Sequence, residues 1–143
     1  MSARPERIRP IAIGVVRRDD GALLVTSALD PATGRTYARP PGGGIEPGER
    51  AVETVVRELR EELGIEASSP RLLAVVEHLF ELGGVVAHEH VFVLAVDLAA
   101  DAVLPPATDA GHPVWWLEPA RFDDPSIALV PAGLAELLAE HPR

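Results

Sequence analysis

Residues 43–65 read GGIEPGERAVETVVRELREELGI, and this stretch carries the strongest structural signal in the chain. Its apolar positions fall at the spacing of one face of a helix, at 52, 55, 56, 59 and 63. We expect a helix from Glu49 to Leu63 that ends at Gly64, since glycine favours the position after a helix C-terminus. An acid four residues before a base predicts a Glu53–Arg57 pair on its surface.

Three carboxylates of this helix, Glu58, Glu61 and Glu62, stand at i, i+3 and i+4 and so share one side. Like charges at these spacings oppose helix formation by a few tenths of a kcal/mol per pair. Taken alone, an Arg-Glu-Glu segment is more often a solvated helix face. The crowding makes sense if a hard divalent cation binds there, because Mg²⁺ and similar ions prefer carboxylate oxygens.

The wider pattern has fixed positions at Gly43, Glu49, Arg57, Glu58, Leu59, Glu61, Glu62, Gly64 and Ile65. It resembles the signature of the Nudix hydrolase family, and every fixed position matches. The resemblance implies an α/β fold, namely the Nudix-type α/β/α sandwich with a mixed β-sheet. A single domain over residues 1–143 is expected.

The resemblance also implies an enzyme, a metal-dependent hydrolase of the phosphoanhydride bond in a nucleoside diphosphate linked to another group. Water would attack phosphorus. By position in the motif, Glu58, Glu61 and Glu62 would be metal ligands, and Glu58 also acts as a base in some relatives. The carbonyl of Gly42, just before the motif, would add a ligand. The expected cofactor is Mg²⁺, with Mn²⁺ as an alternative.

Two further motif residues, Glu49 and Arg57, are expected to pair and to orient the ligand group. With Glu58, Glu61 and Glu62 they complete the expected catalytic set. The general base varies in the family and often lies outside the motif. Glu77, Glu89 and Asp109 are therefore candidates, although an ordinary surface carboxylate is the more common role for each.

Possible substrate contacts lie on both sides of the motif. Tyr37 and Arg39 flank the Pro40-Pro41 entry, and Arg suits phosphate. Trp116 could stack on a base, and Asp109 lies in the loop where several relatives keep an acidic ligand. The histidines His78, His88 and His90 could touch substrate or metal, but packed histidines are more common, and nothing in the sequence completes a tetrahedral zinc set.

Composition narrows the remaining function classes. The 143-residue chain has a formal net charge of −9, which argues against a stable nucleic-acid partner. All thirteen basic residues are arginine, so a P-loop lysine and a Schiff-base lysine are excluded. Cysteine is absent, which excludes thiolate chemistry. The apolar runs are too short for a membrane span. A cytoplasmic location is expected, and a homodimer is left open.

Outside the motif, turn and strand patterns predict the remaining elements. We expect a hairpin from strands at 11–18 and 22–28, a loop at 30–41, long strands at 71–82 and 85–98, a loop at 99–111, a strand at 114–117 and a terminal helix at 131–140. The two hairpins require antiparallel pairs, which is why a mixed sheet is expected.

The motif does not select a substrate within the family. Relatives that remove oxidised nucleoside triphosphates recognise the purine edge with an asparagine amide, and this chain has no asparagine, which lowers that alternative. A nucleotide-binding or sensor module with weak catalysis is a second alternative. It is disfavoured because degenerate members usually lose motif glutamates, and none is lost here.

Overall fold

The computed structural model describes residues 4–142 and contains two four-stranded sheets. The first sheet has the order β4-β1-β6-β5, with β1 (Ile8–Val15), β4 (Gly42–Gly44), β5 (Ala67–Leu82) and β6 (Val85–Leu98). The second has the order β7-β2-β3-β8, with β2 (Leu23–Leu29), β3 (Thr36–Arg39), β7 (Val114–Leu117) and β8 (Ile127–Leu129). The helices are α1 (Ala51–Leu63), α2 (Leu134–Glu140) and a short 3-10 turn η1 (Pro119–Arg121).

Both sheets are mixed. In the first, β1 runs parallel to β6 and antiparallel to β4. In the second, β3 runs parallel to β8 and antiparallel to β2. The predicted α/β class with mixed strand pairing is therefore confirmed, with the strands divided between two sheets.

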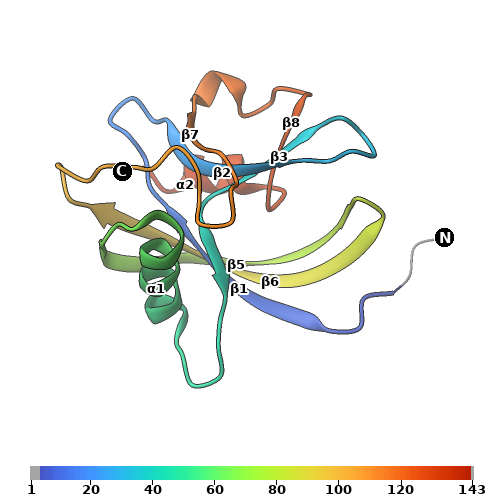
Figure 1. Ribbon diagram of the computed structural model, residues 1–143, viewed down its shortest axis with the longest axis horizontal. Coiled ribbons are helices and arrows are strands. Elements are labelled where there is room, and N and C mark those ends of the chain that lie inside the picture. The colour runs from blue at the N-terminus through green and yellow to red at the C-terminus, as the bar shows by residue number, and fades with distance from the viewer. Residues whose placement is uncertain (1–3, 143) are drawn as a thin grey trace.

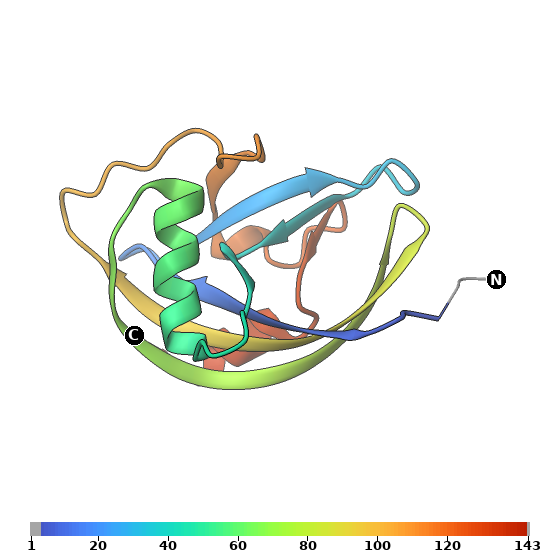
Figure 2. The ribbon, with the colours of Figure 1, turned by 60° about the horizontal axis from the view of Figure 1, so that its bottom comes forward.

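The two helices close two apolar cores on opposite sides of the strands (Figures 1 and 2). Alternation along β1 explains the division, because successive side chains of a strand point to opposite faces. Ala12 packs in the core that contains Leu59 of α1, whereas Ile11 and Ile13 pack in the core that contains Leu134 of α2. This places α1, with the motif glutamates, against one face of the first sheet, in contact with β1, β4 and β5.

The hairpin formed by β5 and β6 is long and curved, and Figure 2 shows its far end bending toward the β2–β3 turn. A hydrogen bond connects the two sheets there, since the Tyr37 hydroxyl donates to the carbonyl of Glu81 at 2.8 Å. The space between the sheets is thereby bounded at the end that lies away from α1.

Three sequence expectations need correction. The turn after residue 18 is present, because Arg18 and Ala22 are joined by a backbone hydrogen bond, but its strands β1 and β2 continue into different sheets. The segment 30–41, expected to be a loop, contains β3, which pairs with β2 just before it and with β8, a three-residue strand far along the chain. The terminal helix begins at Leu134 and not at residue 131, after Gly133 with a φ of 88°.

Among residues 4–142, no helix is long and apolar enough to cross a membrane.

Candidate active site

The helix α1 begins at Ala51, two residues later than the sequence predicts, and this leaves Glu49 outside the helix. Arg50 is the N-cap residue, and its backbone N–H donates to the Glu53 carboxylate at 2.9 Å. Glu53 therefore caps the helix start, and Arg57 finds its partner elsewhere. Glu49 lies before the helix and accepts from the Thr54 hydroxyl at 2.7 Å.

Arg57 is the centre of a hydrogen-bond network. Its Nε donates to Glu49 Oε2 at 2.7 Å and its Nη2 to Glu49 Oε1 at 3.0 Å, a two-point contact. Nη1 donates to Glu58 at 3.0 Å and to Glu61 at 3.1 Å, and Nη2 donates to the Gly44 carbonyl at 3.1 Å. The guanidinium lowers the pKa of Glu49 to about 2. The predicted pairing of Glu49 with Arg57 is thus present, and it fixes α1 to β4.

The glycines of β4 allow the helix to approach this closely. A Cβ atom on Gly43 would lie 2.5 Å from the carboxyl carbon of Glu58, so the absence of a side chain makes room for that carboxylate. The backbone bonds Gly14 N–H to Pro41 O and Ile45 N–H to Pro10 O set the β1–β4 register. In this register the backbone polar groups of Gly42 point away from β1.

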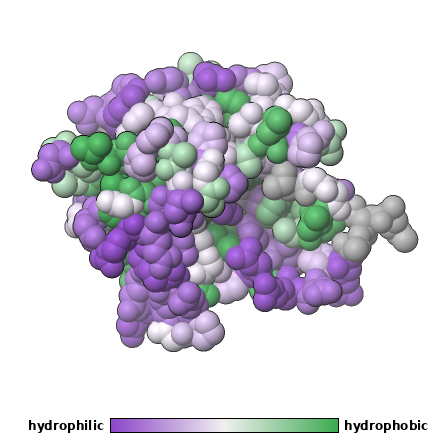
Figure 3. Space-filling model, in the orientation of Figure 1, coloured by the Kyte–Doolittle hydropathy of each residue, from purple (hydrophilic) through white to green (hydrophobic). Residues whose placement is uncertain are grey.

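Glu58 and Glu62 occupy a sheltered position, and Glu61 lies at the solvent side. The Glu58 side chain is 15% exposed and that of Glu61 55%. Burial raises the pKa of Glu58. Burial, followed by repulsion from Glu58, raises the pKa of Glu62 to about 7, and a backbone hydrogen bond at Gly42 partly opposes this. Figure 3 shows hydrophilic side chains over the outer side of α1.

This donor set fits a hard divalent cation. It offers sheltered carboxylates on one helix edge and, at Gly42, a backbone carbonyl that the β1–β4 register leaves unused. The raised pKa values express the cost of keeping two carboxylates, Glu58 and Glu62, ionised together in this position. A bound cation would remove that cost.

Two residues expected from the sequence stand beside Glu62. The backbone N–H of Asp109 donates to the Glu62 carbonyl at 3.2 Å, and the Asp109 carboxylate contributes to the raised pKa of Glu62. Arg39 acts in the opposite direction and lowers it. The loop before β7 and the end of β3 therefore both reach the glutamate edge of α1.

Arg39 connects this edge to a buried acid, Glu89, which is 3% exposed. Glu89 lies 3.7 Å from Arg39 and 4.0 Å from Arg9. His78 pairs with Glu89 across β5 and β6 and is 7% exposed; burial, and then Arg39, lower its pKa. His78 Nε2 and Glu89 Oε1 are buried without a hydrogen-bond partner in the part of the chain that the structure describes. The sequence analysis did not predict Arg9 as part of this site. Only its position on β1, next to Glu89 of β6, reveals the contact.

The other residues predicted for the site lie elsewhere. Tyr37 is at the bridge to Glu81. Trp116, on β7, packs with Arg18, whose guanidinium carbon lies 5.3 Å from the ring centre. Glu77 lies on the opposite face of the β5–β6 hairpin from Glu89, as the alternation of facing pairs requires.

The family is defined by a match to the NUDIX domain model over residues 8–139. The chain therefore belongs to the NUDIX domain family, which confirms the resemblance carried by residues 43–65.

Curated relatives match over part of their length. The chain is 36% identical over 70 residues to the 8-oxo-dGTP diphosphatase of Escherichia coli, covering 49% of this chain and 54% of that protein. It is 36% identical over 63 residues to the asymmetrical bis(5'-nucleosyl)-tetraphosphatase of Mus musculus, covering 44% of this chain and 41% of that protein. The chain thus spans about half the length of the curated relatives it matches.

Solved structures share the whole fold. The MutT NUDIX hydrolase of Burkholderia pseudomallei superposes with a TM-score of 0.67 at 24% identity, covering 96% of this chain and all (100%) of that one. A mutator MutT protein of Bacillus halodurans gives a TM-score of 0.65 at 23% identity, covering 92% and 80%. At these identities the likeness concerns the fold alone.

Proposed function

We propose that this protein is a divalent-cation-dependent hydrolase of the phosphoanhydride bond in a nucleoside diphosphate linked to another group. One observation carries the proposal. Arg57 and Glu49 anchor α1 against β4 so that Glu58 and Glu62 are sheltered side by side over a glycine backbone. The names of both curated relatives, a diphosphatase and a tetraphosphatase that act on nucleotides, favour the same class of bond.

Glu58, Glu61, Glu62 and the Gly42 carbonyl would hold the cation, Mg²⁺ or Mn²⁺. When bound, such an ion neutralises the charge that develops on the phosphate oxygens and lowers the pKa of water. Arg57 keeps the glutamates in place through its bonds to Glu58 and Glu61. Its own geometry is fixed by the two-point contact with Glu49.

The substrate phosphates would lie between α1 and the end of β3. The positive charge of Arg39 lowers the pKa of Glu62, so the two side chains are close enough to interact. In this position Arg39 would contact a phosphate oxygen of the substrate. The attacking water needs a base, and we assign this role to Asp109. It is exposed and adjacent to Glu62, whereas Glu89 lies buried between two arginines.

One comparison supports a second class of substrate, the oxidised nucleoside triphosphates. The Escherichia coli relative is named for an oxidised deoxyguanosine triphosphate, and the chain has no asparagine to read a purine edge. Two buried atoms that lack a hydrogen-bond partner among the described residues, His78 Nε2 and Glu89 Oε1, offer other polar contacts for a nucleotide base. The proposed partner is the nucleotide itself; a homodimer and a cytoplasmic location remain predictions.

The test is a nucleotide panel assayed with Mg²⁺ in ¹⁸O-labelled water, with products identified by mass. We expect label on a phosphate product, since water attacks phosphorus. Glu61→Gln and Glu62→Gln should reduce turnover by about a hundredfold or more, because each removes a charge that holds the cation. Glu66→Gln, at an exposed ion pair with Arg60, is the matched control and should keep full activity.

Two outcomes would contradict the assignment. Wild-type turnover in both Glu61→Gln and Glu62→Gln would remove the glutamates from the reaction. Tight binding of a nucleotide with no product across the panel would instead support a sensor module.

A further inference from the structure

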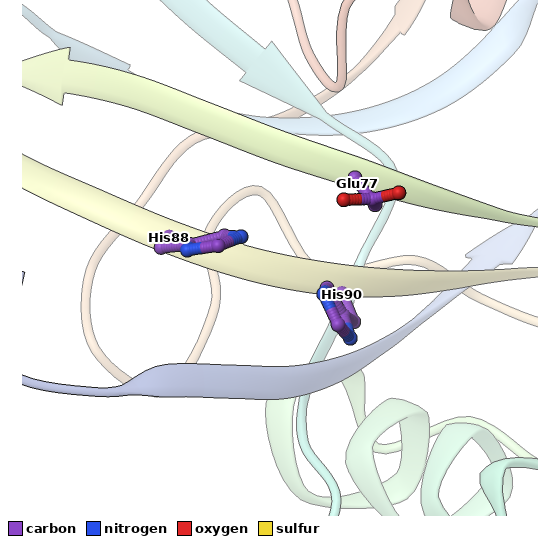
Figure 4. A group of neighbouring side chains, drawn as sticks. All are labelled: Glu77, His88 and His90. Carbon is purple, nitrogen blue, oxygen red and sulfur yellow. The ribbon is translucent and has the colours of Figure 1, made fainter.

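A second group of potential metal ligands, which the proposed hydrolase site does not use, lies on the β5–β6 hairpin. It consists of Glu77, His88 and His90 (Figure 4). Glu77 faces His90 directly across the two strands. His88 and His90 are two residues apart on β6, so all three side chains start from the same face of the sheet.

The ligand atoms of this group already lie close together. One nitrogen or oxygen from each residue falls within 4.8 Å of the other two. The rings of His88 and His90 are 5.6 Å apart at 75°, so neither ring stacks over the other. The Glu77 side chain is exposed and both histidines are half-exposed, so other rotamers are open to them for closing onto one ion.

One nitrogen of this group has no partner within the part of the protein that the structure describes. His88 Nε2 is buried and has no hydrogen-bond partner among the described residues. Its neighbours across the two strand pairs are apolar, Ile8 of β1 and Leu79 of β5. A buried imidazole nitrogen that the protein leaves without a partner points to a ligand from outside the chain.

The residue types select the kind of ion. Imidazole nitrogens suit borderline ions such as Zn²⁺, whereas Mg²⁺ prefers oxygen ligands. Two histidines and one carboxylate give three ligands and leave one tetrahedral position open.

We propose that Glu77, His88 and His90 form a second cation site, specific for Zn²⁺ or a similar borderline ion. The site joins β5 to β6 and is separate from the carboxylate edge of α1. This inference does not depend on the proposed hydrolase activity, since it concerns other residues and another class of ion.

Zinc binding is measured by calorimetric titration of a parent variant, Glu58→Gln/Glu62→Gln, in which the α1 carboxylates no longer compete. One equivalent of Zn²⁺ should bind to this parent. Adding His88→Ala and His90→Ala should weaken the affinity by about a hundredfold or more, since losing even an outer partner of a ligand costs roughly tenfold to a hundredfold. His112→Ala, in the exposed loop before β7, is the matched control and should leave the affinity unchanged.

Two results would overturn the site. One is the absence of zinc binding by the parent, and the other is an unchanged affinity after loss of both histidines. If the histidine variants do not fold, X-ray absorption at the zinc edge of the wild-type protein decides, with one equivalent of Zn²⁺ added. Scattering from two imidazoles supports the site, and a shell of oxygen atoms alone contradicts it.

Discussion

The glutamate edge of α1 and the Glu77–His88–His90 group differ in how the fold supports them. On α1, Arg57 alone donates to Glu49, Glu58, Glu61 and a carbonyl of β4. On the hairpin, by contrast, the Nε2 atom of His88 has no hydrogen-bond partner within residues 4–142. Both groups consist of residue types that serve as metal ligands in proteins, yet only the first is held in one geometry by side-chain hydrogen bonds.

This difference separates two kinds of function. Catalysis needs ligands that are in position before the substrate arrives, because misplacement by about 1 Å can cost a hundredfold in rate. Binding of an ion tolerates side chains that rearrange. The supporting bonds of α1 are therefore the features whose loss should damage the reaction most.

Among the residues that support the glutamates, the largest effect is expected from Gly43→Ala. The new methyl group would lie 2.5 Å from the Glu58 carboxyl and must displace it. Turnover should fall by about a hundredfold, while the melting temperature changes little, because the displaced group is the end of a flexible side chain. Gly44→Ala is the matched control, since its methyl group would meet only the tip of Arg9, at 3.4 Å. Equal turnover in the two variants would show that the glycine makes no room for catalysis.

Stability distinguishes the two arginines of α1. Arg57, whose side chain is 23% exposed, holds several carboxylates that its removal leaves without a counter-charge, so Arg57→Leu should cost about 2 kcal/mol. Arg60, 58% exposed, pairs with Glu66 at the surface, and Arg60→Leu should cost clearly less than Arg57→Leu, because solvent screens an exposed ion pair. Urea unfolding measures both values. A larger cost for Arg60 would contradict the central position of Arg57.

Much of this network was predictable because the motif fixes residue types at fixed spacing. The pairing of Glu49 with Arg57 and the shared side of Glu58 and Glu62 follow from it. The Glu53–Arg57 pair did not form, since i,i+4 spacing favours it weakly and the free N–H at the helix start takes Glu53 instead. Spacing alone cannot rank such competing partners.

Contacts between different segments of the chain could be predicted less well from the sequence. β3 is four residues long and precedes two prolines, so the sequence pattern around it indicates a loop. Its backbone is a strand because it pairs with β2 and β8. Likewise, Arg9 and Arg39 meet at Glu89 because the two sheets face each other. The Glu77–His90 contact needed the strand register, which sequence patterns leave undetermined.

A smaller effect is expected on the pH dependence of stability, through Glu49. The pKa of Glu49 falls from the ordinary value of 4.5 to about 2 in the folded protein, mainly through Arg57. A lowered carboxyl pKa stabilises the fold above the unfolded value, and this contribution is lost as the pH falls from about 4.5 to about 2. In Glu49→Gln, the free energy of unfolding should therefore decrease less steeply with falling pH over this range than in the wild-type protein. Glu136→Gln, exposed on α2, serves as the control, and an equally steep loss in Glu49→Gln would contradict the assignment.

The smallest effect is expected at the hairpin. Tyr37→Phe removes the 2.8 Å hydrogen bond to Glu81 and should cost about 0.5–1.5 kcal/mol. Amide hydrogens near the β5–β6 turn should exchange faster, while those of α1 stay unchanged. Unaltered exchange near the turn would show that this bond does not hold the hairpin against the second sheet.

The central claim is that the sheltered glutamates of α1 hold a divalent cation on a substrate phosphate. Anomalous diffraction from a crystal soaked with Mn²⁺ and a non-hydrolysable nucleotide analogue tests it most directly. We predict an anomalous peak in contact with Glu58, Glu62 and the phosphates of the analogue. A bound analogue with no peak near either glutamate would contradict the account.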